Sequence, residues 1–210
     1  MYERPLMAGE HADISKAVLG RRREFAAGRA CAREALSELG YPPCELRRDR
    51  DRLPLWPDGV IGSISHCEGF CGAVAAQISS VAGLGLDAEV IAPLDDDLFA
   101  MVCRPDEAAR WSASRTPRTG WAKLAFCAKE AFYKAYYPQT RAFLDFTDVS
   151  VVFQPTSHDR GEFRVSIPDP TKPLHGQAGD FAGRWIESSG LVDRKSTRLN
   201  SSHGYISYAV

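Results

Sequence analysis

The 210-residue sequence has no apolar run that approaches the roughly 20 residues of a membrane-spanning helix. Its first residues, MYERPLMAGEHAD, lack the apolar core that follows a basic start in a signal peptide. The chain also lacks an excess of charge of either sign, because its formal net charge is −1. We therefore expect a cytoplasmic protein that binds neither nucleic acid nor membrane, in which any anion site comes from local clustering of basic residues.

Paired cysteine motifs are missing as well. The six cysteines are scattered, and in a chain without a secretion signal we expect buried free thiols. His66, Cys67 and Cys71 come close together in the sequence, but their spacing is not that of a zinc site and no second pair follows. A zinc site at this position is therefore the less favoured alternative.

Two strong helical patterns are present. The segment 15–39 has an apolar stripe at helical spacing and ends before a Gly-Tyr-Pro-Pro stretch. The segment 121–137 is the second, and we expect Pro138 to close it. A further helix is predicted over 98–111, after a linker marked by the acidic run 95–97.

Strand patterns lie between and after these helices. Short apolar segments over 59–77 and 81–90 indicate buried strands, and a charged, Pro-rich loop precedes them over 46–59. Alternating segments over 143–167 and the stretch 181–190 indicate further strands. Two halves of similar composition in helices and strands predict an α+β fold with an internal pseudo-duplication.

The corresponding domain boundaries are an N-terminal α+β subdomain over 1–94 and a C-terminal one over 95–192. From about Asp193 the chain reads DRKSTRLNSSHGYISYAV, which is polar and has no clear period. It resembles translated vector or adapter sequence. We therefore expect residues 193–210 to be a non-native tail and exclude them from the predicted fold.

Asp87 and Glu89 are two residues apart on a predicted strand, so both side chains point to the same face. Two neighbouring carboxylates repel each other unless a cation lies between them or one is protonated. Oxygen ligands of this kind suit a hard cation such as Mg²⁺. A solvated strand end is the simpler alternative.

Glu130 lies four residues before Lys134, a spacing that often forms a surface salt bridge on a helix. Here several Phe and Tyr residues surround the pair, which disfavours full solvation. Near a metal, the carboxylate could ligate the ion or take a proton, and the lysine could stabilise a leaving group. Both interpretations are open from the helix alone.

Three further residues suggest an anion site. Arg29 lies close to the apolar seam of the first long helix, where a guanidinium could meet a phosphate oxygen, whereas Arg21 to Arg23 read as a solvated flank. We interpret Gly62 to His66 as a small-residue turn that presents the Ser65 hydroxyl and the His66 imidazole, and such a turn can hold a phosphate. A structural histidine is the alternative.

Four stretches, in this order, resemble the Sfp/EntD-type 4'-phosphopantetheinyl transferases, particularly the enterobactin-synthase component D and actinobacterial branch. They are RRREFAAGRACAREAL (21–36), WPDGVIGSISH (56–66), GLGLDAE (83–89) and WAKLAFCAKEAFYKAYYP (121–138). The resemblance implies two similar α+β subdomains related by pseudo-two-fold symmetry, with the active site in the cleft between them. The sequence does not fix the oligomeric state, but the internal two-fold would let one chain form the whole cleft, and we expect a monomer.

The resemblance further implies the reaction and its residues. The enzyme would transfer the 4'-phosphopantetheine group of coenzyme A to a serine of an apo acyl or peptidyl carrier protein, releasing 3',5'-ADP. Asp87, Glu89 and Glu130 would hold Mg²⁺, and Glu130 and Lys134 would be catalytic. The nucleotide phosphates would be bound by a set of four residues: Arg29, Ser65, His66 and Lys129.

The sequence departs from the family pattern in places. Asp51 stands where a basic residue often precedes the Trp-Pro pair, so no phosphate contact is assigned there. Relatives usually carry another segment before the first basic helix, which leaves open whether Met1 is the true start. The alternatives are another Mg²⁺-dependent phosphotransferase or pyrophosphate hydrolase, and a non-catalytic or inactive subunit of a siderophore or polyketide synthase assembly.

Overall fold

The computed structural model describes residues 5–112, 120–175, 181–188 and 191–199, and the predictions about Met1 and about residues 200–210 lie outside them. The helices are α1 (Ala8–Ile14), α2 (Leu19–Glu38), α3 (Asp96–Val102), α4 (Pro105–Ser112), α5 (Trp121–Thr140) and the 3-10 helix η1 (Phe146–Asp148). The strands are β1 (Val60–Cys67), β2 (Phe70–Gln77), β3 (Val81–Val90), β4 (Ser150–Pro155), β5 (Arg160–Ser166), β6 (Phe181–Ser188) and β7 (Leu191–Leu199). The expected α+β class is confirmed.

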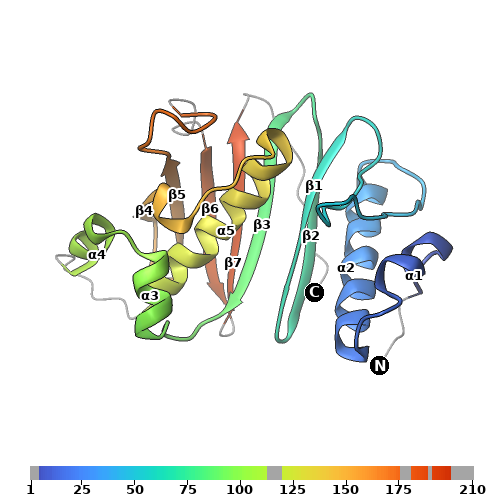
Figure 1. Cartoon of the computed structure of the whole chain (residues 1–210), viewed down its shortest axis with the longest axis horizontal. Helices are drawn as coiled ribbons and strands as arrows, with labels where there is room; N and C mark the ends of the chain where they lie inside the picture. Colours follow the sequence, from blue (N-terminus) through green and yellow to red (C-terminus); the bar gives the residue numbers. More distant parts are fainter. Residues whose placement is uncertain (1–4, 113–119, 176–180, 189–190, 200–210) are drawn as a thin grey trace.

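Two antiparallel sheets form the framework. Strands β1 and β2 make a hairpin that packs against α2, and a five-stranded sheet has the order β3-β7-β6-β5-β4. Helix α5 lies across one face of the larger sheet, and β3 stands at its edge beside the β1–β2 hairpin (Figure 1). The largest core cluster fills the space between α5 and β4–β6, around Phe132, Tyr136, Phe163 and Trp185.

The larger sheet includes β7, which contains residues 193–199 of the expected non-native tail. That this segment is non-native stays a prediction. The backbone of β7 is hydrogen-bonded to β3 on one side and to β6 on the other. The predicted boundary at residue 94 stays a proposal, although β3, on its N-terminal side, pairs into the sheet of the C-terminal half.

Several predicted boundaries differ from the structure for local reasons. The helix expected over 98–111 is two helices, because Pro105 disfavours a helical conformation at the residue before it and begins α4. The expected linker starts α3 instead, with the Asp95 carboxylate capping the Leu98 N–H at 2.8 Å. The first long helix begins only at Leu19, after the separate α1. Gly62 to His66 is not a turn but part of β1.

The two halves repeat one set of buried contacts. In the N-terminal half, the fully buried Glu10 on α1 accepts the Met7 N–H, three residues before it, at 2.9 Å. The same carboxylate accepts hydrogen bonds from Arg33 on α2 at 2.7 Å and from the Leu46 N–H at 2.9 Å. One buried carboxylate therefore joins the short helix, the long helix and the segment after it.

Glu107 occupies the same place in the C-terminal half. It is fully buried on α4, accepts the Arg104 N–H at 2.9 Å, and is also three residues after that donor. Its other partners are Lys129 on α5 at 2.7 Å and the Val151 N–H of β4 at 2.7 Å. An internal pseudo-duplication predicts this kind of recurrence, although the sequence letters around Glu10 and Glu107 show none of it.

Candidate active site

The junction of β3 and α5 is unusually close because β3 has glycines where the helix crosses it. A Cβ added to Gly85 would lie 1.8 Å from the Ala131 carbonyl oxygen. A Cβ on Gly83 would lie 3.1 Å from the Ala135 carbonyl oxygen of the same helix. Only residues without a side chain permit this approach of helix backbone to strand backbone. It brings the carboxylates of β3 and α5 to one place.

Asp87 is the centre of this junction. Its side chain is buried on β3, and Oδ1 accepts hydrogen bonds from Lys134 Nζ at 2.7 Å and from Ser65 Oγ at 3.0 Å. Ser65 in turn accepts the Ala88 N–H at 3.2 Å. Asp87 Oδ2 is buried and has no hydrogen-bond partner among the described residues. A buried acceptor without a partner is costly, so this oxygen suits a bound cation or donor.

Glu130 and Glu89 complete the group of carboxylates. Burial raises the pKa of Glu130 above its ordinary value, and the negative charges of Asp87 and Glu89 raise it further, against the opposing charge of Lys134. Glu89 accepts a 3.0 Å hydrogen bond from Lys123, on the first turn of α5. The charges of Lys134, Asp87 and Glu89 thus all act on the Glu130 carboxyl.

These carboxylates are not arranged as a preformed metal site. Within the described ranges, no group of three or more acidic, His or Cys side chains is gathered closely enough to hold an ion. Two of the carboxylate oxygens already form ion pairs, Asp87 Oδ1 with Lys134 and Glu89 Oε2 with Lys123. The donor set still fits a hard cation, since the oxygens repel one another and Asp87 Oδ2 is without a partner.

A cationic cavity of about 510 Å³ lies next to this junction, on the N-terminal half. Its walls come from the end of α1, the first turns of α2, the turn before Trp56, and β1. The basic residues that line it are Lys16, Arg21, Arg29, Arg48, Arg52 and His66. The charges of Lys134 and Asp87 both act on His66, so the cavity adjoins the carboxylates.

Arg29 is the most buried cation of this cavity, with a relative exposure of 4%. Its guanidinium carbon lies 4.3 Å from the centre of the Phe25 ring, and that of Arg48 lies 5.2 Å from the same ring. Burial and the nearby Arg48 lower the pKa of Arg29, against the opposing charge of Glu10, to about 10. Arg29 Nε has no partner among the described residues, which suits an anion.

His66 lies at the rim of the cavity, with Nε2 2.6 Å from an Arg21 nitrogen. Burial lowers the pKa of His66. A neutral imidazole accepts the Arg21 hydrogen bond at Nε2. Ser65 is buried, and its hydroxyl donates a hydrogen bond to Asp87. The contact that the structure shows for Ser65 is therefore to Asp87, and a direct bond from this hydroxyl to phosphate would require that contact to break.

Lys129 is not part of this site. Its ammonium is buried in the C-terminal half and donates to Glu107 at 2.7 Å, to the Val102 carbonyl at 2.8 Å and to the Phe146 carbonyl at 3.0 Å. All three of its donors are thus used by the protein. This placement argues against the predicted phosphate contact, and we leave Lys129 out of the proposed site.

Four basic cavity residues were not assigned to an anion site from the sequence, and one of them, Arg21, was interpreted as part of a solvated flank. Lys16, Arg48 and Arg52 are separated from Arg29 along the chain, and Asp51 interrupts the expected basic position. The only sequence signal was the density of arginines in RRDRDR (47–52). Which of these side chains face the cavity depends on a turn in which Arg52 has a φ of 67°.

Two family models match the chain. Residues 9–76 match the family model of the 4'-phosphopantetheinyl transferase N-terminal domain, and residues 83–186 match that of the 4'-phosphopantetheinyl transferase superfamily. The chain is 43% identical over 191 residues to the 4'-phosphopantetheinyl transferase Svp of Streptomyces mobaraensis, a match covering 89% of this chain and 76% of Svp.

Two other relatives are similar. The 4'-phosphopantetheinyl transferase PptT of Mycobacterium tuberculosis is 36% identical over 181 residues, covering 85% of this chain and 80% of PptT. Enterobactin synthase component D of Salmonella typhimurium is 37% identical over 128 residues, covering 60% and 53%. The fold, the family models and these identities define an enzyme of the transferase class. The chain belongs to the 4'-phosphopantetheinyl transferase superfamily, Sfp/EntD type.

Proposed function

We propose that this protein transfers the 4'-phosphopantetheine group of coenzyme A to a serine of an apo acyl or peptidyl carrier protein. The supporting observation is the buried Asp87 oxygen without a partner, beside two more carboxylates and next to a cavity lined by basic residues. The carboxylates would suit the cation of a pyrophosphate, and the basic cavity would suit a second phosphate. Coenzyme A carries both.

In this proposal Asp87, Glu89 and Glu130 hold Mg²⁺, which would neutralise charge on the pyrophosphate. The cavity beside them takes the remaining phosphate of coenzyme A, on the ribose, with Arg29 and His66 in contact with it. The buried Arg29 Nε supports this role, because a guanidinium without an acceptor gains a charge-assisted hydrogen bond from the phosphate. Ser65 acts indirectly by holding Asp87.

The chemical step moves one group and one proton. The serine oxygen of the carrier protein attacks the β-phosphorus, and the bond from that phosphorus to the bridging oxygen of the pyrophosphate breaks. The products are the phosphopantetheinyl serine and 3',5'-ADP. Glu130 takes the serine proton, directly or through water. Lys134 stabilises the charge on the leaving group.

The test is incubation of the protein with coenzyme A, Mg²⁺ and an apo carrier protein, followed by mass spectrometry of the carrier. We expect the phosphopantetheine mass on the carrier and release of 3',5'-ADP. Asp87→Ala should abolish transfer, whereas Asp58→Ala, which removes an exposed carboxylate, should not. A carrier that stays unmodified by well-folded wild-type protein would overturn the proposal.

The remaining proposals concern the setting of the reaction. We propose a cytoplasmic monomer with two subdomains, since one chain supplies both the carboxylates and the cationic cavity. Nucleic acid and membranes are not proposed partners. None of the helices in the described part of the chain is long and apolar enough to span a membrane.

A further inference from the structure

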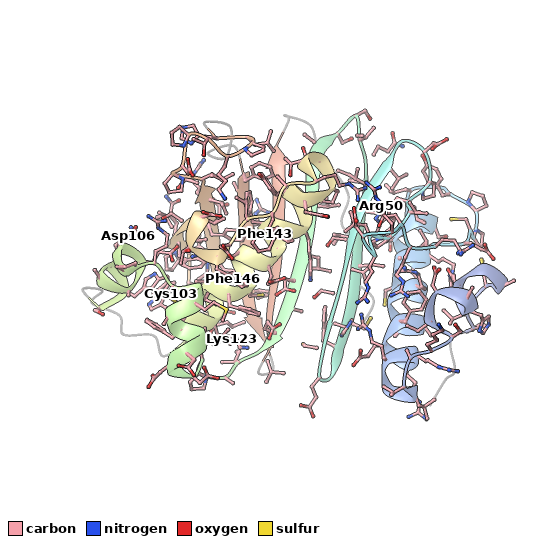
Figure 2. All side chains as sticks on the ribbon, viewed as in Figure 1. Arg50, Cys103, Asp106, Lys123, Phe143 and Phe146 are labelled. Carbon is pink, nitrogen blue, oxygen red and sulfur yellow. The ribbon has the colours of Figure 1, made fainter. Side chains whose placement is uncertain are left out.

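A bridge between the two halves lies where α5 ends. One terminal nitrogen of Arg141 contacts two carboxylates of the N-terminal half, Asp49 at 2.8 Å and Asp51 at 2.7 Å. Neither family resemblance nor local pattern assigned a role to these three residues. Figure 2 shows the neighbouring Arg50 beside the C-terminal end of α5, with Lys123 at the other end of the helix.

On the N-terminal side, the two carboxylates belong to a tight turn. Asp49 Oδ1 accepts the N–H groups of Asp51 at 2.9 Å and Leu53 at 2.8 Å. The Asp49 N–H donates to the Leu53 carbonyl at 2.9 Å, and Arg48 is bridged to Pro54. The turn from Arg48 to Pro54 is therefore held as a unit, in which movement of the carboxylates moves its arginines too.

The turn has two chemically different sides. Arg48 and Arg52 line the cationic cavity, whereas Asp49 and Leu53 line a separate, mostly apolar cavity of about 280 Å³ that also contacts Arg141. Arg52 has a left-handed backbone with a φ of 67°, a conformation that a long side chain adopts only when its surroundings impose it. The contacts with Arg141 are on the side away from the basic residues.

On the C-terminal side, Arg141 is fixed to the helix of the active site. It is the C-cap of α5, with a left-handed φ of 53°, and its N–H donates to the Tyr137 carbonyl at 2.8 Å. Its guanidinium carbon lies 5.9 Å from the centre of the Tyr137 ring. Glu130 and Lys134 are on the same helix, so the bridge connects the helix of the chemical step with the turn of the cationic cavity.

We propose that Arg141 is a positioning residue for coenzyme A. Through Asp49 and Asp51 it holds the Arg48–Pro54 turn so that Arg48 and Arg52 meet the ribose phosphate while Glu130 and Lys134 meet the pyrophosphate. This inference rests on the proposed function, because it names the contacts of that substrate. Without Arg141, the neighbouring carboxylates of Asp49 and Asp51 repel each other. The turn then keeps only its contacts within the N-terminal half, such as the 2.9 Å hydrogen bond from the Arg48 N–H to Asp13.

The test compares two donors, coenzyme A and 3'-dephospho-coenzyme A, which lacks the ribose phosphate. For Arg141→Asn, in which asparagine tolerates the left-handed backbone, we expect KM for coenzyme A to rise about 5- to 10-fold. KM for the dephosphorylated donor and kcat should stay within about twofold of the wild type, because Arg141 touches neither the pyrophosphate nor the serine. Arg141→Lys should restore most of the affinity, since an ammonium can still attract both carboxylates.

A double-mutant cycle separates the bridge from unrelated effects. Asp51→Asn should raise KM for coenzyme A in the same way, and Asp51→Asn combined with Arg141→Asn should be no worse than the more severe single variant. Arg160→Asn is the matched control, because Arg160 forms an exposed pair with Asp159 at 3.1 Å, outside the proposed site. It should leave both KM values unchanged.

Three results would overturn the inference: an equal rise of KM for both donors, a loss confined to kcat, or additive effects in the cycle. Binding of 3',5'-ADP, measured by calorimetry without metal or carrier protein, keeps the test independent of turnover. Arg141→Asn should weaken this binding by a similar factor. A wild-type protein that binds 3',5'-ADP but does not modify a carrier would refute the proposed function. The role of Arg141 would still be supported if Arg141→Asn weakened the binding of 3',5'-ADP.

Discussion

The Lys134 ammonium contacts the Asp87 carboxylate at 2.7 Å, across the junction between α5 and β3. Lys134 therefore pairs with the strand and not with Glu130, one turn before it on the same helix. Glu130 is left without an ion pair among the described residues, and burial and its acidic neighbours raise its pKa. Of the three carboxylates, it is the one that a bound cation would stabilise most.

Glu130→Gln should have opposite effects on activity and stability. Transfer to a carrier protein should fall at least about 10²-fold, because both metal binding and proton acceptance are lost. In Mg²⁺-free buffer the melting temperature should rise, by about 2–4 °C for each kcal/mol of repulsion removed. Glu68→Gln, at an exposed position in the β1–β2 turn, should change neither value. A Glu130→Gln protein that melts below the wild type would contradict this account.

The stability difference between Glu130→Gln and the wild type should depend on pH in one direction. The folded-state pKa of Glu130 is raised above 4.5, its ordinary value. The stabilisation that protonated Glu130 gives the folded state is therefore fully present below pH 4.5, and it is lost as pH rises through the folded-state pKa. Glutamine does not titrate, so the advantage of the variant should be smallest near pH 4.5 and largest near about pH 8. Thermal melts without Mg²⁺ measure it, and a gap that shrinks toward neutral pH would contradict the raised pKa.

Lys129→Met should destabilise the fold without weakening coenzyme A binding. Removing the ammonium leaves Glu107 as a buried charge without its counter-ion, a change that typically costs about 3–5 kcal/mol. Chemical denaturation measures the loss, and KM for coenzyme A, measured where the variant is folded, should equal that of the wild type. Lys172→Met removes a more exposed pair with Asp148 and should change stability little. A raised KM for Lys129→Met would restore Lys129 to the substrate site.

Arg29→Ala should weaken binding of the nucleotide. A hydrogen bond to a charged group contributes about 1.5–3 kcal/mol, which corresponds to a rise of KM for coenzyme A of at least about tenfold. The dissociation constant of 3',5'-ADP, measured by calorimetry, should increase by the same factor. Arg23→Ala removes an exposed arginine from the same helix and is the control. If Arg29→Ala and Arg23→Ala bound 3',5'-ADP with equal affinity, Arg29 would not contact the phosphate.

Gly85→Ala should impair folding and transfer together. The added methyl group would meet the Ala131 carbonyl at 1.8 Å, so α5 has to move away from β3. Overpacking of this kind costs about 1–3 kcal/mol or more, and it separates Glu130 from Asp87. Gly20→Ala, where no atom lies within 4 Å, should be neutral or slightly stabilising. A Gly85→Ala protein with wild-type melting and turnover would show that the close packing is not required.

Much of the site follows from local sequence pattern. Asp87 and Glu89 share a face because strand residues alternate, and both do lie on β3. Glu130 and Lys134 are one turn apart because the aromatic and alanine-rich segment is helical, as α5 shows. The order of the four motifs was sufficient to recognise the family. These features depend on residues a few positions apart, and so the sequence by itself determined them.

The tertiary structure alone decided which partner each charge meets. Nothing local distinguishes Lys129, which has a buried structural role with Glu107, from Lys134, which reaches Asp87. The pairing of β7 with β3 and β6 likewise rests on backbone hydrogen bonds, which a polar sequence without period does not reveal. Partners distant in the chain meet only when the whole fold assembles, because packing as close as that at Gly85 sets which groups come within hydrogen-bonding distance.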